Sequence, residues 1–550
     1  MEQPAQPGTD FILDALAKEG IDHLFLVPGG LIDPFLPALG RQKFLRPIVA
    51  AQEGGAACMA DGYARASRNF GAALCIGGPG LTNAVTAVAA AKTDGVPLLL
   101  LSGEVSTFIE GLGMFQDASA QTLDDVAIVR PLTRYSASID NAQNLPHLFK
   151  HAMLQIRARP AGPVHVSLPG DVLMGEITVS YERIESGLVN PAPLSLRDAQ
   201  ASLQHFARSA TARALVRVAI LAGAGVEHAA ASQALRQFAG YAGTHHARMA
   251  FLETPLDLLI VLGSGLNERD TMHWSLQLRP NATICVNFTP ETIGAHTLGG
   301  GVVGDCGAYL NYLLSQNETL RASLEPTVAG RGAWLSSIRS KPRLQDIENC
   351  RSEAAPLHPA RVVSEWRRLF PPDGILVVDS GAHRAFAGHY WEAYEAGTYV
   401  SATNLGPMGW AIPAAVGVQC AQPRRRVAVI TGDGCMQMNG IEVSTAARYR
   451  LPIIFIVMNN SALGNVWLRA HALGPVPDEL TRLPDHDWAT FAEALGCRGE
   501  TVRKPGELAG ALERALAGPG PCVIDAKVNK AFPTPVKDWT AAVASFSYHE

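Results

Sequence analysis

Two groups of polar residues follow neighbouring apolar runs in the C-terminal part of the chain. The triplet Gly-Asp-Gly at 432–434 follows the run 427–430, and a pair of asparagines ends the run 453–458. Such runs predict buried parallel strands joined by a crossover helix, with ligands at their carboxyl ends. Asp433 and Asn460 would then lie at neighbouring strand ends, and a carboxylate, an amide oxygen and a nearby backbone carbonyl are ligands that Mg²⁺ prefers. The pair predicts a magnesium and diphosphate site, whereas a lone Gly-Asp-Gly would indicate only a turn.

The triplet, the asparagine pair and the spacing between them resemble the signature of thiamin diphosphate enzymes. The flanking sequence resembles the acetohydroxyacid (acetolactate) synthase-like branch of that family, over nearly the whole chain and most strongly at 50–105 and 400–465. The resemblance implies thiamin diphosphate and Mg²⁺ as cofactors, with Asp433, Asn460 and the backbone of Ala462 as metal ligands.

Length and composition narrow the class of protein. A chain of 550 residues is too long for one core, and about three domains are expected. It has 47% hydrophobic and 17% charged residues and a net charge of −5, without a basic block that would favour nucleic acid. The N-terminus lacks the pattern of a signal peptide, and no apolar run reaches the roughly 20 residues of a membrane span. Nine scattered cysteines without CxxC spacing favour buried free thiols, so a cytoplasmic protein is expected.

Helical patterns alternate with apolar strands along most of the chain. This alternation predicts open, mainly parallel sheets with helices on both faces. The resemblance implies three doubly wound α/β domains, Rossmann-like or flavodoxin-like. They are a pyrimidine-binding domain at 1–185, a shortened middle domain at 195–325 and a diphosphate-binding domain at 355–550.

Glu53 is the candidate functional acid of the first domain. It ends an apolar strand and opens a helix at 53–67 whose many small residues suit close packing against another backbone. The plain interpretation is a helix N-terminal carboxylate that interacts with the helix dipole. The acid is expected in a tight, apolar environment, and the resemblance implies that it contacts N1′ of the thiamin pyrimidine and promotes the imino tautomer that takes the C2 proton.

The segment 77–105 is similar to the family almost residue for residue. Its glycines do not form a P-loop, because the Lys and Ser/Thr of that motif are absent. The stretch GMFQDAS resembles one in which a Phe and a Gln face the thiazolium, although Gln116 could also be a solvated loop amide. The catalytic candidates are Glu53, Gln116, Phe115, Gly29 and Gly30.

The segment SGAHRAF resembles the turn that holds the diphosphate. Relatives often have Gln where this chain has Ala382, so His383 and the backbone would carry that contact; the alternative for His383 is a capping or surface histidine. Met408 corresponds to the apolar wedge between the two thiamin rings, and the alternative is core filling. The cofactor-binding candidates are Glu53, Pro79, Asn83, Gly381, Ala382, His383, Gly406, Met408, Gly432, Asp433, Gly434, Cys435, Asn460, Ala462, Leu463 and Gly464.

The middle domain departs from the family pattern. Its two GxG fragments lack a third glycine and are weak signals for a dinucleotide. The stretch between Tyr241 and Leu256 is much shorter than in relatives where it helps to enclose FAD, so FAD is not expected as a cofactor. The adjacent His245 and His246 are expected at the surface.

The resemblance implies decarboxylation of a 2-oxo acid such as pyruvate and transfer of the acyl group to an acceptor carbonyl. The alternatives are a non-oxidative decarboxylase, a 2-hydroxyacyl-CoA or oxalyl-CoA type lyase, and a non-catalytic cofactor-binding or regulatory homologue, of which loss of Glu53 would be the sign. Acceptor preference is open, because Arg469 stands where the synthases have the Trp that selects 2-oxobutyrate. In the family the domains that carry Glu53 and Asp433 come from different subunits, which implies a homodimer or homotetramer with no nucleic-acid or membrane partner.

Overall fold

The structure is a computed structural model. It describes residues 5–184, 194–213, 217–223, 225–226, 229–242, 256–266, 283–288, 293, 300–340, 344 and 346–535. The chain forms two compact units, the first from residues 1–188 together with 346–550 and the second from residues 189–345.

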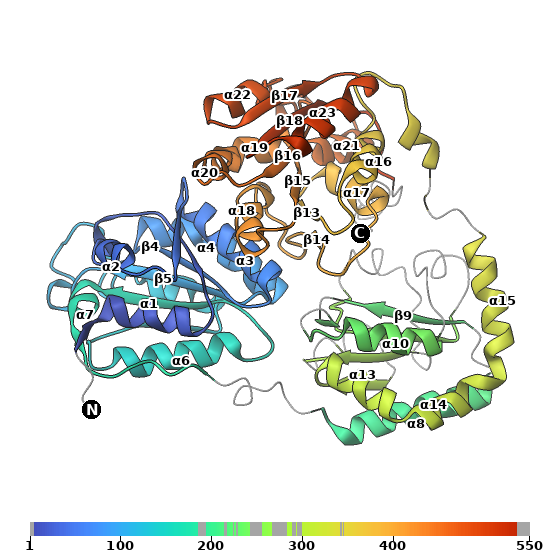
Figure 1. Cartoon of the computed structure of the whole chain (residues 1–550), viewed down its shortest axis with the longest axis horizontal. Coiled ribbons are helices and arrows are strands. Elements are labelled where there is room, and N and C mark those ends of the chain that lie inside the picture. Colours follow the sequence, from blue (N-terminus) through green and yellow to red (C-terminus); the bar gives the residue numbers. More distant parts are fainter. Residues whose placement is uncertain are drawn as a thin grey trace. The chain divides into compact units, whose positions relative to one another are not determined.

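The N-terminal part of the first unit is built on a six-stranded parallel sheet of order β3-β2-β4-β5-β7-β6. Helices cover both of its faces, α1 and α6 on one and α3 and α4 on the other (Figure 1). The strands are β2 (His23–Leu26), β3 (Arg46–Val49), β4 (Gly71–Ile76), β5 (Leu98–Glu104), β6 (Tyr135–Ser138) and β7 (Val164–Pro169). The helices are α1 (Gly8–Lys18), α2 (Phe35–Arg41), α3 (Glu53–Ser67), α4 (Pro79–Asp94), α5 (Asp125–Val129) and α6 (Leu145–Arg157).

The C-terminal part of the first unit holds a second six-stranded parallel sheet, of order β14-β13-β15-β16-β18-β17. Gly432 at the end of β15 is paired with Met458 near the end of β16, so the two predicted polar groups do lie at neighbouring strand ends. The strands are β13 (Ile375–Val378), β14 (Tyr399–Val400), β15 (Val427–Gly432), β16 (Ile453–Asn459), β17 (Arg498–Val502) and β18 (Cys522–Lys527). The helices are α16 (Pro359–Leu369), α17 (Ala382–Tyr390), α18 (Ala411–Ala421), α19 (Asp433–Asn439), α20 (Val443–Arg448), α21 (Gly464–Leu473), α22 (Trp488–Ala494) and α23 (Pro505–Ala517).

Helices α3 and α18 join the two halves of the first unit. A Cβ on Gly62 of α3 would lie 2.1 Å from the carbonyl oxygen of Ala414, and one on Gly417 of α18 would lie 1.8 Å from that of Met59. Neither position has room for a side chain, so the backbones touch. The small residues of the helix at 53–67 therefore have the packing role that their pattern predicts.

The second unit is a four-stranded parallel sheet of order β12-β11-β10-β9 with helices around it (Figure 1). The strands are β9 (Val218–Ala222), β10 (Leu258–Leu262), β11 (Thr283–Asn287) and β12 (Gly300–Val303). The helices are α8 (Leu196–Arg213), α10 (Ser232–Ala242), α13 (Cys306–Ser315), α14 (Asn317–Leu324) and α15 (Val328–Arg339). Three parallel α/β sheets confirm the predicted fold class. Residues 243–255, with His245 and His246, lie outside the described residues.

All nine cysteines are free, and eight of them are buried. In the part of the chain that the structure describes, no helix combines the length and the apolar character that crossing a membrane requires.

Candidate active site

The predicted metal ligands meet where β15 and β16 end. Asp433 Oδ2 and Asn460 Oδ1 both accept the N–H of Ala462, each over 3.1 Å. Asp433 is the first residue of α19 and is 3% exposed, and its Oδ1 also accepts the N–H of Gly434 at 3.0 Å. Two oxygens of the predicted types are thus fixed side by side. Ala462 contributes its N–H to this corner, and coordination through its carbonyl stays a prediction.

The electrostatics of this corner fit a divalent cation. Burial raises the pKa of Asp433 to about 6, against the lowering effect of the N–H groups of Gly434, Ala462 and Ser461. A bound cation would keep such a carboxylate ionised. Among the described residues no group of three His, Cys, Asp or Glu side chains could hold a metal ion. An ion here would have one carboxylate and one amide oxygen from side chains, which suits Mg²⁺ with water and diphosphate oxygens completing its shell.

The two asparagines of the pair have different surroundings. Asn459 is 2% exposed, and its amide donates to Asp525 Oδ1 at 3.0 Å and to the carbonyl of His486 at 3.0 Å. It therefore ties β16 to β18, whereas Asn460 faces the cavity.

A cavity of about 630 Å³, solvent at its mouth included, opens at this edge of the C-terminal sheet. Twelve of the cofactor-binding candidates line it: Gly381, Ala382, His383, Met408, Gly432, Asp433, Gly434, Cys435, Asn460, Ala462, Leu463 and Gly464. The structure thus gathers most of the predicted diphosphate group into one hollow.

His383 tests whether this hollow suits a diphosphate. The side chain is 7% exposed, and within the described residues its Nε2 has no hydrogen-bond partner. Burial, with a contribution from Arg384, lowers the pKa of His383 to about 3, although a hydrogen bond with the backbone of Asp379 opposes the shift, so the imidazole is neutral and has a single N–H donor. It lies in the first turn of α17, where free backbone N–H groups favour anions. The free N–H groups at this helix start fit phosphate oxygens and the buried imidazole lies beside them, so the surface alternative for His383 is wrong.

Met408 is held by an acid that sequence reasoning missed. Asp379, 1% exposed, accepts the N–H of Gly409 at 2.9 Å and the hydroxyl of Thr431 at 3.0 Å. It fixes the turn after Met408 to the ends of β13 and β15. The signal was an acid directly after the apolar strand 375–378. Gly406 is not among the cavity-lining residues, and a Cβ on it would lie 3.5 Å from Ser380 Oγ.

Polar residues after β18 also line the cavity and were missed. Asn529 and Lys530 follow a strand that is paired with β16, so they come out at the same edge as Asn460. Lys530 also lies 5.4 Å from the ring centroid of Trp467 on α21. The strand-end rule that identified Asp433 would have found them, had it been applied to the strand at 522–528.

The N-terminal candidates form a second group, around the start of α3 and α4. Asn83 Nδ2 donates to Glu53 Oε2 at 3.0 Å, and a Cβ on Gly80 would lie 3.5 Å from Glu53 Cγ. Pro79 is the first residue of α4. Glu53 is half-buried in the single chain, so the tight apolar environment expected for it is not found there.

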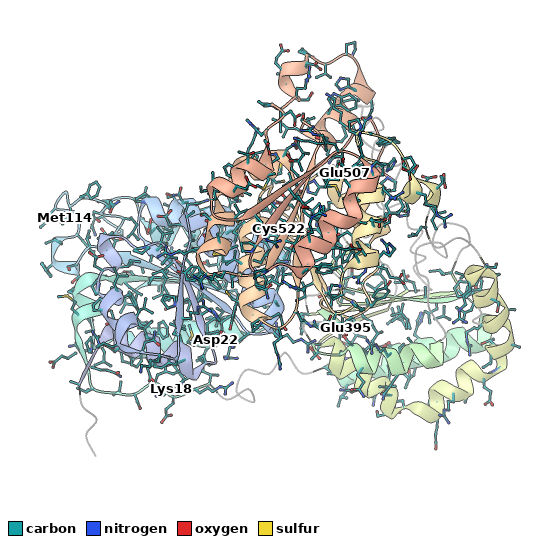
Figure 2. The ribbon with its side chains drawn as sticks, turned by 45° about the horizontal axis from the view of Figure 1, so that its top comes forward. Lys18, Asp22, Met114, Glu395, Glu507 and Cys522 are labelled. Carbon is teal, nitrogen blue, oxygen red and sulfur yellow. The ribbon has the colours of Figure 1, made fainter. Side chains whose placement is uncertain are left out.

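The remaining N-terminal candidates lie on loops next to this group. Gly29 packs on Ile76, and Gly30 opens a short 3₁₀ turn. Gln116 has a φ of 61° and its carbonyl lies 3.9 Å from a Cβ built on Gly78. Phe115 is 81% exposed, and its neighbour Met114 lies at the outer edge of the N-terminal part of the unit (Figure 2).

None of the N-terminal candidates lines the cavity of the C-terminal sheet in the described single chain. The structure therefore shows two separate groups, one suited to a metal and a diphosphate and one built around Glu53.

Comparison with known proteins places both groups in one family. Residues 7–128 match the family model of the thiamine pyrophosphate enzyme N-terminal TPP binding domain, and residues 379–526 match that of the C-terminal TPP binding domain. The acetolactate synthase isozyme 3 large subunit of Escherichia coli is 30% identical, with 92% of each chain covered. A probable acetolactate synthase large subunit of Methanocaldococcus jannaschii is 28% identical, over 96% of this chain and 93% of that protein. The acetolactate synthase of Mycobacterium bovis is 27% identical, over 94% and 87%. The two family models and relatives that align over nearly the whole chain thus agree, and the protein belongs to the acetolactate synthase-like family of thiamin diphosphate-dependent enzymes.

Proposed function

We propose that this enzyme uses Mg²⁺, decarboxylates a 2-oxo acid such as pyruvate and transfers the acyl group to an acceptor carbonyl. The observation that carries the proposal is the meeting of Asp433 and Asn460 at the N–H of Ala462, in the wall of a cavity that also contains His383. The names of the relatives support the same reaction class.

The residues of the cavity would hold the cofactor by its charged end. Asp433 and Asn460 would bind the metal, and the first turn of α17 with His383 would bind diphosphate oxygens. Met408, fixed through Gly409 and Asp379, would pack against the rings of the cofactor. Bound thiamin diphosphate supplies a nucleophilic C2 and accepts the electron pair released with CO₂.

Glu53 would hold a proton at N1′ of the pyrimidine ring and exchange it during activation. The amide of Asn83, 3.0 Å from its carboxylate, limits the positions that this carboxylate can take. Positioned proton transfer of this kind is typically worth 10²- to 10⁴-fold in rate.

A homodimer completes the site in this proposal. In the single chain Glu53 does not line the cavity, and the loop next to it exposes several apolar side chains: Phe108 (73%), Leu112 (75%), Met114 (47%), Phe115 (81%) and Leu123 (49%). A second copy would cover these side chains and bring its cavity to Glu53. Association into tetramers would be compatible with the same arrangement.

The direct test is to incubate the purified protein with thiamin diphosphate, Mg²⁺ and a panel of 2-oxo acids, and to identify products by mass and chirality. We expect CO₂ release with formation of a chiral carboligation product. Release of the free aldehyde alone would favour a non-oxidative decarboxylase, and turnover only with acyl-CoA substrates would favour a lyase. Absence of any turnover together with tight cofactor binding would favour a non-catalytic homologue.

A further inference from the structure

A buried acid of the C-terminal part has hydrogen-bond partners in the N-terminal part. Glu442 is 0% exposed and ends the 3₁₀ turn that follows α19. Its Oε1 accepts the N–H groups of Ala51 and Gln52, both at 3.2 Å. Its Oε2 accepts the N–H of Ala51 at 3.1 Å and the hydroxyl of Thr445 at 2.7 Å. The carboxylate thus accepts hydrogen bonds from two consecutive peptide N–H groups in the N-terminal part of the unit.

Those two peptide groups lie immediately before Glu53. Ala51 and Gln52 connect β3 to α3, and Glu53 is the first residue of that helix. The preceding N–H groups are also held: Val49 donates to the hydroxyl of Tyr449 at 2.8 Å, and Ala50 donates to the carbonyl of Leu26 at 2.9 Å. Because every N–H from 49 to 52 has an acceptor, the turn has one defined position, and Glu442 supplies the acceptor for its last two groups.

The first turn of α3 is shaped to receive this acid. A Cβ on Gly55 would lie 1.9 Å from Glu442 Oε1, which no side chain could tolerate. Gln52 closes the start of the helix, since its Oε1 accepts the N–H of Gly54 at 2.7 Å. Glu442 therefore explains why position 55 is a glycine. The two residues are 387 positions apart in the sequence but are in contact in the fold.

A carboxylate suits this position better than a neutral side chain. Burial raises the pKa of Glu442 above its ordinary value, although the hydroxyl of Thr445 and the N–H groups of Ala51 and Gln52 oppose that rise. All of these neighbours are donors, and an ionised carboxylate is acceptor-only. An amide in its place would put its own donor group against one of them.

We propose that Glu442 is a positioning residue for Glu53, and that it holds the turn before α3 so that the carboxylate of Glu53 stays where it exchanges a proton with the cofactor. The inference rests on the proposed function, since it takes Glu53 as the proton-exchanging acid. Glu442 acts through Ala51 and Gln52, while Asn83 holds the Glu53 side chain from the other direction. Loss of such positioning costs up to about 10²-fold in rate, because small displacements of a reacting group have large effects.

The test compares Glu442→Gln with wild type in three measurements. Without cofactor, amide hydrogen exchange followed by mass spectrometry should become at least about tenfold faster across residues 49–55, because two N–H groups lose a charged acceptor. Calorimetry should give an affinity for thiamin diphosphate and Mg²⁺ within about threefold of wild type, because the cavity is untouched. Exchange of the cofactor C2 proton, measured by NMR at saturating cofactor, should be at least about tenfold slower, and kcat should fall with little change in KM.

Two further variants keep the test interpretable. Glu500→Gln changes an acid of β17 whose partner is Arg514 at 2.6 Å, and it should leave all three measurements unchanged. Thr445→Val removes only the hydroxyl at Glu442 Oε2, and it should give a smaller effect of the same sign if Glu442→Gln fails to fold.

The outcomes separate the inference from the proposed function. Wild-type C2 exchange in a folded Glu442→Gln protein would overturn the inference, as would a loss of C2 exchange explained wholly by weaker cofactor binding. If wild type itself shows no C2 exchange with thiamin diphosphate and Mg²⁺, the proposed function is wrong and the inference falls with it.

Discussion

The two six-stranded sheets of the first unit have the same strand order. Counted along the chain within each sheet, the order is second, first, third, fourth, sixth, fifth in both. The third strand is β4 in one and β15 in the other, and each leads directly into a helix after a glycine. The two folds therefore offer equivalent strand ends, and any difference in chemistry comes from the residues placed there.

Those residues differ completely. The end of β15 carries Asp433 and the end of β16 carries the asparagine pair, a set of oxygens for a cation. At the equivalent places the N-terminal sheet has Gly78 with Pro79, and Glu104. Glu104 Oε1 accepts the N–H groups of Val105 and Ala118, so it closes the loop that follows β5. The comparison teaches that topology selects the edge of the sheet at which a site forms, while a few side chains decide what the site binds.

The largest effect on cofactor binding is expected from a substitution at the end of β15, where the C-terminal sheet has the proposed metal ligand Asp433. Asp433→Ala should abolish binding of thiamin diphosphate and Mg²⁺ in calorimetry, because one of two proposed side-chain ligands is lost. The control is Asp478→Ala, which removes an acid that is 61% exposed in the same half of the unit. Normal cofactor affinity in the Asp433 variant would break the assignment of the metal site.

The complementary change in the N-terminal half should spare binding and stop chemistry. Glu53→Gln keeps the shape of the side chain but not the proton exchange, so cofactor should bind while C2 exchange and turnover fall by at least about 10²-fold. Unchanged C2 exchange by NMR would count against the role of Glu53.

Mixing these two inactive variants tests whether the halves of a site come from different subunits. A mixed dimer of Glu53→Gln and Asp433→Ala chains contains one site built from two intact halves, so random exchange of subunits should restore about a quarter of wild-type activity. No recovery after verified subunit exchange would mean that each chain builds its own complete site.

The contact between the halves depends on a buried ion network. Asp61 of α3, 0% exposed, accepts from Arg65 at 2.9 Å and from the indole N–H of Trp410 at 2.7 Å. Asp61→Ala leaves both donors without this acceptor, and removal of one member of a buried pair typically costs about 3–5 kcal/mol. Denaturant unfolding should show a loss of that size, and a change below about 1 kcal/mol would mean that the backbone contact of α3 with α18 holds the halves by itself.

The buried acids of the N-terminal sheet should make stability depend on pH. Burial raises the pKa of Asp125 to about 7. The hydrogen bond from the N–H of Gly78 opposes this rise, and the nearby charge of Glu104 adds to it. The folded state holds this proton more tightly than the unfolded chain, so the contribution is complete at acidic pH and is lost as pH rises through 7. Relative to Asp125→Asn, the apo wild type should lose roughly 1 kcal/mol between pH 6 and pH 8. If the free energy of unfolding changed by the same amount in the two proteins between these pH values, the prediction would be contradicted.

The smallest effect on activity is expected from adding FAD, which would bind at the four-stranded sheet of the second unit. The second unit has two GxG fragments, and the N–H of Gly225 is already donated to the carbonyl of Gly263 at 3.0 Å. We expect a colourless protein whose activity does not respond to FAD. A flavin absorbance band in the purified protein, or activity restored by FAD after dialysis, would refute this and move the function towards biosynthetic acetohydroxyacid synthases.

The sequence by itself determined the strands that carry the site and the residues at their ends. The runs 427–430 and 453–458 are apolar because both faces of a parallel strand are buried, and the polar residues after them stand where that burial ends. The helix at 53–67 was predicted with its bounds as observed, since its small residues and its acid at the start are local signals. Short strands of mixed polarity, such as β6 and β17, were missed because edge strands are buried less completely and lose the apolar pattern.

Only the tertiary structure decided which residues act together. Asn459 and Asn460 are adjacent in sequence and equivalent in type, yet one ties two strands and the other faces the cavity, because Asn459 is the last residue of β16 and Asn460 lies past the end of that strand. Glu442 carries no local signal of its role, since the peptide groups that it holds come from a distant part of the chain. The hydrogen bonds from Ala51 and Gln52 to Glu442 join the same two halves that pack through α3 and α18, and such packing is a property of the folded backbone and not of any single segment.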